Sequence, residues 1–322
     1  MKMCNISVVM PVYNAEKYIG IQLKSILKQT LIPDEIIICD DSSTDSTCKQ
    51  IQKIVDQSAK YKKIVKLIKN TNRLGMNRNF EKAVSLSNGE YIFLCDADDY
   101  WFKNKINYMF NLISKSKNLI AINNCRFADH QLMPLKIKKI EQIEKIFKSY
   151  DNFIPGCCVV FKKKIKDLYL PLPQFNISYD TWLNFVGNKI SKRLLVRNVF
   201  QLYRRHSANN TFAIFNITKN LNFYNIFIIR LKILLKSLFL RNQIISLEIL
   251  KHKEILNRIK KSNNFEKKLN IQIESDLKKL YLRKNFLGKN FIARIYQSMF
   301  NKNNINIWSS ETSKFLDTFR IS

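Results

Sequence analysis

Glycine and proline are scarce in this sequence, with six of each among 322 residues, and no Cys-x-x-Cys pair occurs. The seven cysteines are an odd number, which favours reduced, small apolar side chains over a disulfide framework or a zinc site. No uncharged apolar run approaches the roughly 18 residues that a membrane-spanning helix needs. Asn5 and Pro11 interrupt the apolar start, so we expect no secretory signal peptide. These absences predict a protein inside the cell, either soluble or lying on the inner face of a membrane.

Acidic residues are also scarce, since 25 Asp and Glu stand against 55 Lys and Arg, a net charge of +30. Residues 1–212 hold 34 basic and 18 acidic residues, a balance of +16, and residues 213–322 hold 21 and 7, a balance of +14 in about half the length. Such an excess favours an anionic partner: nucleic acid, an anionic membrane surface or a phosphorylated substrate. Alternatively, the excess of basic residues reflects a compositionally biased genome, because Lys and Asn are frequent throughout the chain.

Short apolar segments alternate with helical patterns over the first 125 residues. The expected strands cover 6–11, 35–39, 64–68 and 91–95, and the expected helices cover 15–29, 43–57, 76–87 and 103–116. Continuous apolar strands that alternate with helices are typical of a parallel sheet with helices on both faces. The sequence therefore predicts a doubly wound α/β unit, with a mostly parallel sheet.

The pattern is less regular after residue 125. We expect a Lys-rich connection over 126–150 with a helix near 141–149, a strand over 154–163, a helix over 178–188 and one or two strands over 192–205. From about residue 215 the sequence becomes a Lys- and Asn-rich helical pattern. This change predicts an α/β domain over 1–212, followed by a basic, mainly helical region over 213–322.

Polar side chains follow each of the first four expected strands. In such sheets ligands bind outside the carboxyl ends of the strands, so these residues are expected to meet along one edge. They are Tyr13, Asn14 and Glu16 after the first strand, Asp40 and Asp41 after the second, Asn70, Asn72, Arg73 and Gly75 after the third, and Asp96, Asp98 and Asp99 after the fourth.

Asp96 and Asp98 form an Asp-x-Asp sequence where the fourth strand ends. Carboxylate oxygens suit hard divalent ions, and Mg²⁺ typically takes one or two carboxylates and completes its shell with substrate phosphates. The alternative is a solvated turn that begins a helix, because Asp-x-Asp alone is very common. The position after an alternating α/β run, with Asp40 and Asp41 nearby, favours a site for Mn²⁺ or Mg²⁺.

Five segments resemble, in order, the motifs of the family 2 glycosyltransferases. They are ISVVMPVYNAEKYI, IIICDDSSTDST, NRLGMNRNFEKA, GEYIFLCDADDYW and YDTWL. The stretch YDTWLNFVGN…YRRHSANN is similar to the rhamnosyltransferase-like branch of that family. The resemblance covers roughly residues 5–212 and implies a GT-A fold for a catalytic domain over 1–212. The basic C-terminal region lies outside it.

The resemblance implies a nucleotide-sugar site and a metal site. Asp41 matches the carboxylate that accepts from the uracil or thymine ring, and Asp98 matches the direct metal ligand. His206 matches a residue that completes the metal shell; the alternative is a surface residue in a basic run. Arg78 matches a basic residue near the base or phosphates; the alternative is an ion pair with Glu81. The donor set is Pro11, Tyr13, Glu16, Asp40, Asp41, Arg78 and Asp96, and the metal set is Asp96, Asp98 and His206.

The resemblance also implies an acceptor side. Asp180 matches the catalytic base, and the alternative is a carboxylate that only stabilises a helix terminus. Asp99 matches a position near the sugar. Tyr179 stands where the family usually has a small or acidic residue, or His, and this departure leaves the base itself in place. Trp182 is close enough to Asp180 to serve the acceptor pocket, although core packing is the simpler role for it and for Trp101.

The implied activity is metal-dependent, inverting transfer of a sugar from a UDP- or dTDP-linked donor to a hydroxyl of a glycan or lipid-linked acceptor. The expected setting is bacterial surface polysaccharide biosynthesis, lipopolysaccharide or capsule, in the cytoplasm and peripherally on the inner face of the cytoplasmic membrane. A sugar nucleotidyltransferase is the alternative enzyme, but PVYNAEKYI lacks the Gly-rich phosphate loop expected near the first strand. A nucleic-acid-binding protein is the alternative outside enzymes; because no nucleic-acid motif appears, we expect no nucleic acid partner.

The region 213–322 carries a strongly apolar stretch with scattered bases, 221–250. Arg230, Lys232, Lys236 and Arg241 do not share one helical face, so this is not a clean amphipathic surface helix. We expect a helical appendage that touches the inner leaflet. The alternative is a helical hairpin that packs on the catalytic domain or forms an oligomer with a second subunit.

Overall fold

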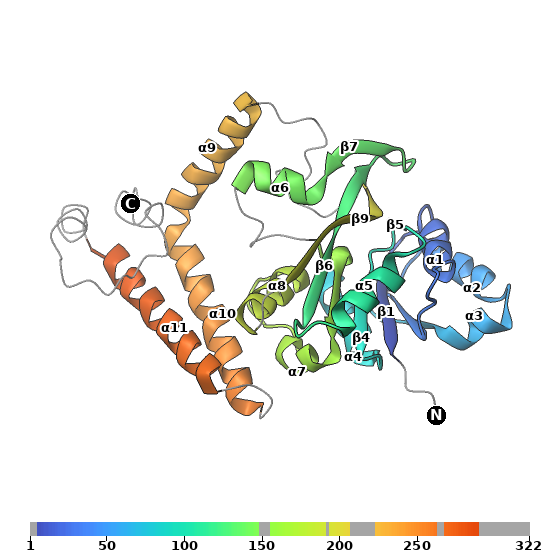
Figure 1. Cartoon of the computed structure of the whole chain (residues 1–322), viewed down its shortest axis with the longest axis horizontal. Helices are drawn as coiled ribbons and strands as arrows, with labels where there is room; N and C mark the ends of the chain where they lie inside the picture. The colour runs from blue at the N-terminus through green and yellow to red at the C-terminus, as the bar shows by residue number, and fades with distance from the viewer. Residues whose placement is uncertain (1–4, 148–154, 191–192, 207–222, 263–266, 290–322) are drawn as a thin grey trace. The chain divides into compact units, whose positions relative to one another are not determined.

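The structure is a computed structural model that describes residues 5–147, 155–190, 193–206, 223–262 and 267–289. The chain divides into two compact units, residues 1–220 and residues 221–322. The boundary predicted at residue 212 falls outside the described residues. Figure 1 follows the chain through both units.

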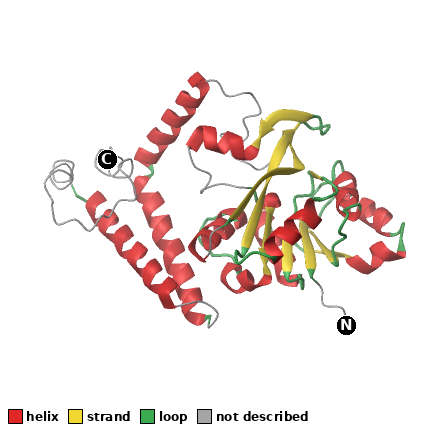
Figure 2. Cartoon of the chain, in the orientation of Figure 1, coloured by secondary structure: helices red, strands yellow, loops and turns green. Residues whose placement is uncertain are grey.

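Among the described residues, the strands of the first unit form a single nine-stranded sheet, drawn in yellow in Figure 2. Their order is β3-β2-β1-β4-β8-β6-β9-β5, and β7 pairs with β6. The strands β1 to β4 pair in parallel, whereas β8 is antiparallel to both β4 and β6. The bounds are β1 Ile6–Val12, β2 Glu35–Asp40, β3 Val65–Lys69, β4 Tyr91–Leu94, β5 Tyr100–Trp101, β6 Ile120–Ala128, β7 Pro134–Lys138, β8 Val159–Lys162 and β9 Leu194–Arg204.

Helices cover both faces of the parallel half of this sheet. The chain moves outward from β1 to β3 and then crosses back to β4, so right-handed crossovers place α1 and α2 on one face and α4 on the other. In agreement, α1 packs on α2, and α4 packs on β1 and β2. The helices are α1 Ile19–Leu27, α2 Thr47–Val55, α3 Ala59–Ile64, α4 Met76–Leu86, α5 Lys105–Ser114, α6 Lys139–Phe147, α7 Lys166–Tyr169 and α8 Tyr179–Ile190.

The elements predicted over the first 125 residues are confirmed, and the connection predicted over 126–150 needs correction. Residues Ile120–Ala128 and Pro134–Lys138 form a pair of antiparallel strands, and within the described part of this range, up to residue 147, the helix is Lys139–Phe147. Strand β6 is hard to predict from the sequence because Asn123 and Asn124 interrupt its apolar run, although both are buried. Asn124 stays satisfied there because its Nδ2 donates to Glu141 Oε2 and to Arg197 O.

Asn77 joins the start of α4 to the start of α8. Its Oδ1 accepts from the backbone N–H of Tyr179 at 3.0 Å, and its Nδ2 donates to the carbonyl of Ile177 at 2.9 Å. Both ends of one side chain are therefore used on the three residues that lead into α8. This contact links the two segments that carry Asn79 and Asp180.

The second unit contains α9 Phe223–Phe239, α10 Arg241–Lys261 and α11 Lys267–Leu287. Helices α10 and α11 pack together through a small apolar core of Ile245, Ile249, Leu280 and Leu287. This confirms helices in the C-terminal region. Across the described ranges, we find no helix with the length and apolar character needed to cross a bilayer.

We expect Asn77→Ala to lower the free energy of unfolding by about 1–3 kcal/mol, because it leaves the Tyr179 N–H and the Ile177 carbonyl without this partner. Urea unfolding followed by circular dichroism measures the change. Asn111→Ala is the matched control, since Asn111 Nδ2 bonds only within α5 at an exposed position. An equal, small loss in both variants would contradict the role given to Asn77.

Candidate active site

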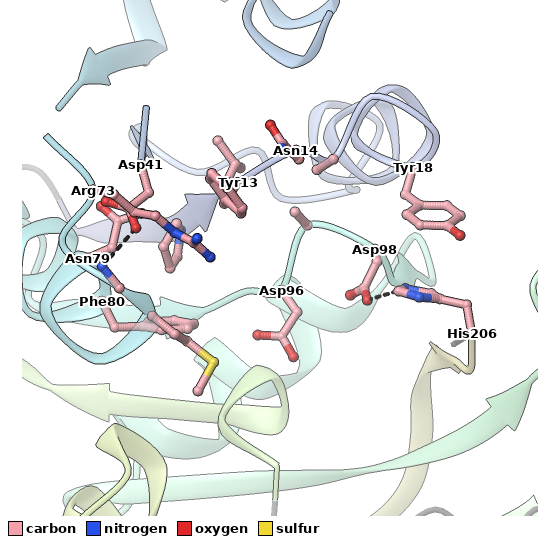
Figure 3. Close-up of a pocket in the computed structure, with 16 residues that line it drawn as sticks. Tyr13, Asn14, Tyr18, Asp41, Arg73, Asn79, Phe80, Asp96, Asp98 and His206 are labelled. Carbon is pink, nitrogen blue, oxygen red and sulfur yellow. Dashed lines mark hydrogen bonds and ion pairs between the residues drawn. The ribbon is translucent and has the colours of Figure 1, made fainter. Parts of the chain in front are cut away.

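A cavity of about 420 Å³ lies at the carboxyl ends of β1, β2 and β4. Figure 3 shows Asp41 and Arg73 at one end, Asp98 and His206 at the other, and Asp96 between them. The cavity therefore brings together part of the strand-end set: Tyr13, Asn14, Asp41, Arg73, Gly75, Asp96 and Asp98. The lining residues are Pro11, Val12, Tyr13, Asn14, Ala15, Tyr18, Asp41, Arg73, Gly75, Met76, Asn79, Phe80, Asp96, Ala97, Asp98 and His206.

Asp41 is fixed by the loop that follows β3. Its Oδ1 accepts from Asn70 Nδ2 at 2.9 Å and from Leu74 N at 2.7 Å, and its Oδ2 accepts from Gly75 N at 2.8 Å. Gly75 has φ +80°, a backbone conformation that side chains rarely adopt, which lets successive amides point at one carboxylate. Because each carboxylate oxygen has two acceptor sites, Asp41 can accept a further donor from the cavity.

Tyr13 and Arg73 form the outer wall beside Asp41. The Arg73 guanidinium carbon lies 3.9 Å from the centroid of the Tyr13 ring, and both side chains are exposed. Such a cation–π contact holds a positive charge and a flat aromatic ring next to the carboxylate. This end of the cavity offers an acceptor, a cation and a stacking surface.

The other end depends on the pairing of β5 with β9. Tyr100 pairs with Leu202 in antiparallel register, which places residues 204–206 beside Asp98. The Arg204 Nε donates to the carbonyl of Asp98 at 2.6 Å, and His206 Nε2 lies 2.8 Å from Asp98 Oδ2. The Tyr18 ring stacks on the His206 ring with centroids 4.5 Å apart, which fixes the orientation of the imidazole.

Asp99 is fully buried beneath this loop, and a sugar in the cavity cannot reach its side chain. Its Oδ2 accepts from Gln201 Nε2 at 2.9 Å, and its Oδ1 accepts from the Arg204 backbone N–H at 3.1 Å. Gln201 Oε1 in turn accepts from the buried Lys105 Nζ, which also donates to the Cys157 carbonyl. Burial raises the pKa of Asp99 well above its usual value. Asp99 was predicted near the sugar, but its buried side chain does not line the cavity and instead supports the loop from within.

Asp180 stands in the first turn of α8. Its Oδ1 accepts from Ser178 Oγ at 2.6 Å and from Thr181 N at 2.7 Å. Burial raises its pKa, although these hydrogen bonds act in the opposite direction. Asp180 does not line the cavity, but it is near enough that its charge contributes to the raised pKa of Asp96.

Asp96 carries an electrostatic cost at the cavity itself. Burial, then the charge of Asp98 and that of Asp180, raise the pKa of Asp96 to about 7. A cation held beside these carboxylates would remove much of this penalty. Asp96, Asp98 and His206 supply carboxylate oxygens and an imidazole nitrogen at the cavity wall, a donor set that fits Mn²⁺ or Mg²⁺.

A second group of candidate ligand atoms lies behind the wall. Asp96, Asp99 and Cys157 offer atoms within 4.8 Å of one another. Burial raises the pKa of the Cys157 thiol well above its usual value, so it is a poor thiolate ligand. Asp99 and Cys157 do not line the cavity, whereas Asp96, Asp98 and His206 do, but among the described residues these three do not form such a group of atoms within 4.8 Å.

The structure gives other partners to three residues predicted at the nucleotide. Glu16 Oε2 accepts from Ser46 N at the start of α2, at 2.9 Å. Asp40 is buried, and its Oδ2 accepts from Ser43 N at 3.1 Å. Arg78 pairs with Glu81 and reaches the Leu172 carbonyl. None of the three lines the cavity.

Two residues predicted in the acceptor pocket are buried. Trp182 is fully buried, and its Nε1 donates to the Tyr169 carbonyl at 3.0 Å, so its role is packing. The Tyr179 ring stacks on Phe80 with centroids 3.7 Å apart. The Tyr179 hydroxyl lies 3.5 Å from Asp96 Oδ1, which places it just behind the cavity wall.

Arg73, Tyr18 and Phe80 line the cavity, although none of them is in the predicted donor, metal or acceptor set. Arg73 follows β3, so the strand-end pattern contained a signal for it, but Arg78 was preferred as the basic residue. Tyr18 and Phe80 lie on helical patterns and were indistinguishable from core residues. Only the folded structure shows that they face the cavity.

Several proteins of similar sequence are named as glycosyltransferases. Over 138 residues the chain is 30% identical to the UDP-Glc:alpha-D-GlcNAc-diphosphoundecaprenol beta-1,3-glucosyltransferase WfgD of Escherichia coli, covering 41% of this chain and 52% of that protein. The match therefore spans about half the length of that relative. Over 224 residues it is 30% identical to the dTDP-rhamnosyl transferase RfbG of Shigella flexneri, covering 63% of this chain and 74% of that protein.

Solved structures of similar shape share little sequence. TarS of S. aureus in complex with UDP-GlcNAc has a TM-score of 0.56 and 16% identity, covering 86% of this chain and 72% of that chain. The mannosyltransferase PcManGT from Pyrobaculum calidifontis, in complex with GDP-Man and Mn2+, has a TM-score of 0.51 and 13% identity, covering 99% and 80%. These likenesses show the fold, which is the predicted GT-A fold with C-terminal helices.

A family model matches the part of the chain that carries the first four strand ends. Residues 7–169, half of the chain, match the sequence model of glycosyl transferase family 2. This segment includes Asp41, Asp96 and Asp98, and it ends before Asp180. The chain belongs to glycosyl transferase family 2.

Proposed function

We propose that this enzyme transfers a sugar from a UDP- or dTDP-linked donor to a hydroxyl of a lipid-linked glycan, with inversion, in the biosynthesis of a bacterial surface polysaccharide. The observation that carries this proposal is one cavity with Asp41 at one end, Asp98 and His206 at the other, and Asp96 between them. The names of WfgD and RfbG, which include UDP-Glc and dTDP-rhamnosyl, support a UDP- or dTDP-linked donor. The proposed setting is lipopolysaccharide or capsule assembly.

Asp41 and its neighbours would bind the nucleoside. Uracil and thymine both present a ring N–H, which Asp41 can accept while its other contacts keep the carboxylate in place. Tyr13 and Pro11 border the same space, and Arg73 is positioned to meet negative charge on the nucleotide. Asp96 lies between this end and the Asp98 end, where the diphosphate would lie.

Asp96, Asp98 and His206 would hold a Mn²⁺ or Mg²⁺ ion. Such an ion supplies charge neutralisation for the leaving diphosphate and acts as a Lewis acid. Arg204 supports these residues from behind, because it bonds both to the Asp98 carbonyl and to the Asp99 carboxylate. These bonds hold the backbone of the loop at Asp98 and the side chain of Asp99.

Asp180 would act as the general base. It takes the proton from the acceptor hydroxyl while that oxygen forms a bond to the anomeric carbon and the bond from this carbon to the diphosphate oxygen breaks. A single attack from the face opposite the diphosphate inverts the configuration. Burial raises the pKa of Asp180, which makes it a stronger base, and Ser178 and Thr181 orient its carboxylate.

We propose a lipid-linked acceptor at the inner face of the cytoplasmic membrane. The name of WfgD gives that protein a diphosphoundecaprenol acceptor, which supports this choice. The basic balance of residues 213–322 favours attraction to an anionic leaflet. The enzyme would then work peripherally in the cytoplasm.

We expect Asp180→Asn to lower kcat about 10²–10⁴-fold, because an amide cannot take the acceptor proton. Binding of the nucleoside diphosphate is expected to be unchanged, since Asp180 does not line the cavity. Steady-state release of nucleoside diphosphate measures the first quantity, and calorimetry the second. Asp56→Asn, an exposed carboxylate paired with Lys62, is the matched control. Normal turnover in Asp180→Asn would contradict its role as base.

We expect Asp41→Ala to weaken UDP or dTDP binding about 10- to 100-fold, because the ring N–H loses a charged acceptor. GDP binding serves as the comparison: its guanine does not present the single ring N–H of the pyrimidines in the same place. Isothermal titration of the three nucleotides gives the values. Equal weakening for all three would indicate a folding defect around Gly75 instead of lost base recognition.

We expect EDTA to abolish turnover and Mn²⁺ to restore it, since Asp96, Asp98 and His206 fit a divalent ion. In His206→Ala the Mn²⁺ concentration for half-maximal rate should rise at least about tenfold. The exposed His130 does not line the cavity, so His130→Ala is the control. An EDTA-resistant rate would overturn the metal assignment while leaving the nucleotide end untouched.

A further inference from the structure

Helix α9 exposes a row of large apolar side chains. Tyr224, Phe227, Leu231 and Leu235 are 68%, 55%, 39% and 46% exposed. They are separated by three, four and four positions, so at about 100° per residue they lie within roughly 80° of the helix circumference. We call these four residues the α9 stripe. A soluble protein seldom exposes such a row unless it binds something.

The opposite side of α9 is different. Ile226, Ile229 and Ile233 lie about half a turn away from the α9 stripe and are only partly exposed. This helix therefore has two apolar faces, of which one is half-buried and the other open. Among the α9 side chains whose exposure is described, the aromatic ones are Tyr224 and Phe227, and both lie on the open face.

The charges beside the α9 stripe indicate an anionic partner. Arg230 and Lys232 are exposed, and each lies roughly 100° from the centre of the stripe, one on either side. Long basic side chains can lie along an apolar surface and place their charges at its edge. Helix α9 contains no Asp or Glu, and none occurs in the sequence between Asp180 and Glu248.

We propose that the α9 stripe lies in the surface plane of an anionic lipid bilayer. Tyr224, Phe227, Leu231 and Leu235 would enter the region between head groups and acyl chains, while Arg230 and Lys232 meet lipid phosphates. The 17 residues of α9 give a length of about 25 Å, less than the roughly 30 Å of a hydrocarbon core, which fits a helix that lies flat.

A second copy of the chain is the less favoured occupant. Two α9 stripes facing each other would bring Arg230 and Lys232 of both copies together, and the helix has no acidic residue to pair with them. The bilayer inference rests on the proposed function in one respect: a lipid-linked acceptor is presented at the same surface. It names the part of the chain that would dock there.

Vesicle binding of the full-length protein tests the inference. The probes are large vesicles of phosphatidylcholine alone and with about one third phosphatidylglycerol. We expect binding to the anionic vesicles, and Phe227→Ser/Leu231→Ser should lower the partition coefficient at least about tenfold. Arg230→Gln/Lys232→Gln should lower it about tenfold and reduce its dependence on salt.

The matched control is Leu250→Ser/Ile271→Ser, which removes two exposed apolar side chains, 45% and 68% exposed, from α10 and α11. It should bind vesicles as the wild type does. Equal binding by the control and the α9 variant would overturn the inference. So would a stripe variant that changes a dimer to a monomer in sedimentation, or one that loses stability because α9 packs on the chain itself.

The test is separable from the proposed function. UDP binding, measured on the same preparations, should be the same in all variants because none of the changed residues lines the cavity. Vesicle binding without any affinity for UDP or dTDP would sink the proposed donor and leave the membrane surface standing. Nucleotide binding with no vesicle binding would overturn the membrane inference and leave the proposed donor standing.

Discussion

Repulsion among the carboxylates that follow β4 is the constraint on which the rest of the site depends. Asp96, Asp98 and Asp99 lie within four consecutive positions, and like charges at such distances oppose one another strongly when water is excluded. The structure gives each a different environment: Asp99 is buried against Gln201 and Arg204, and Asp98 lies against His206. Asp96 remains at the cavity with a pKa raised to about 7, so the need for a cation is concentrated there.

These three partners, Gln201, Arg204 and His206, come from strand β9 and the residues just after it. Gln201 and Arg204 lie on it, and His206 follows it, roughly one hundred residues after the carboxylates in the sequence. The short β5–β9 pairing holds the two segments in register, and Lys105 supports Gln201 from below. The donor end is built more locally, because Asp41 is fixed by the loop 70–75 between β3 and α4. One end of the cavity thus depends on long-range sheet pairing and the other on a glycine turn.

The sequence predicted the parallel half of the sheet because continuous apolar strands and helical spacing are local signals. It also predicted that Asp41, Asp96, Asp98 and His206 belong to one site, and the structure brings these four to a single cavity. The sequence did not predict the direction of individual side chains. Arg73 lines the cavity, whereas Arg78 pairs with Glu81, although both follow the same strand. Strand β6 was missed because buried Asn123 and Asn124 look like loop residues until Glu141 and Arg197 are seen to satisfy Asn124.

The most direct test is a donor screen with purified full-length protein, Mn²⁺ and a panel of UDP-, dTDP- and GDP-sugars, with release of nucleoside diphosphate as the readout. The account predicts release from a UDP- or dTDP-sugar only, at a rate that rises when a lipid-linked acceptor is added. Release from a GDP-sugar alone would contradict the assignment of Asp41 to a pyrimidine base. Neither binding nor release with any donor would contradict the assignment of the cavity as a nucleotide-sugar site.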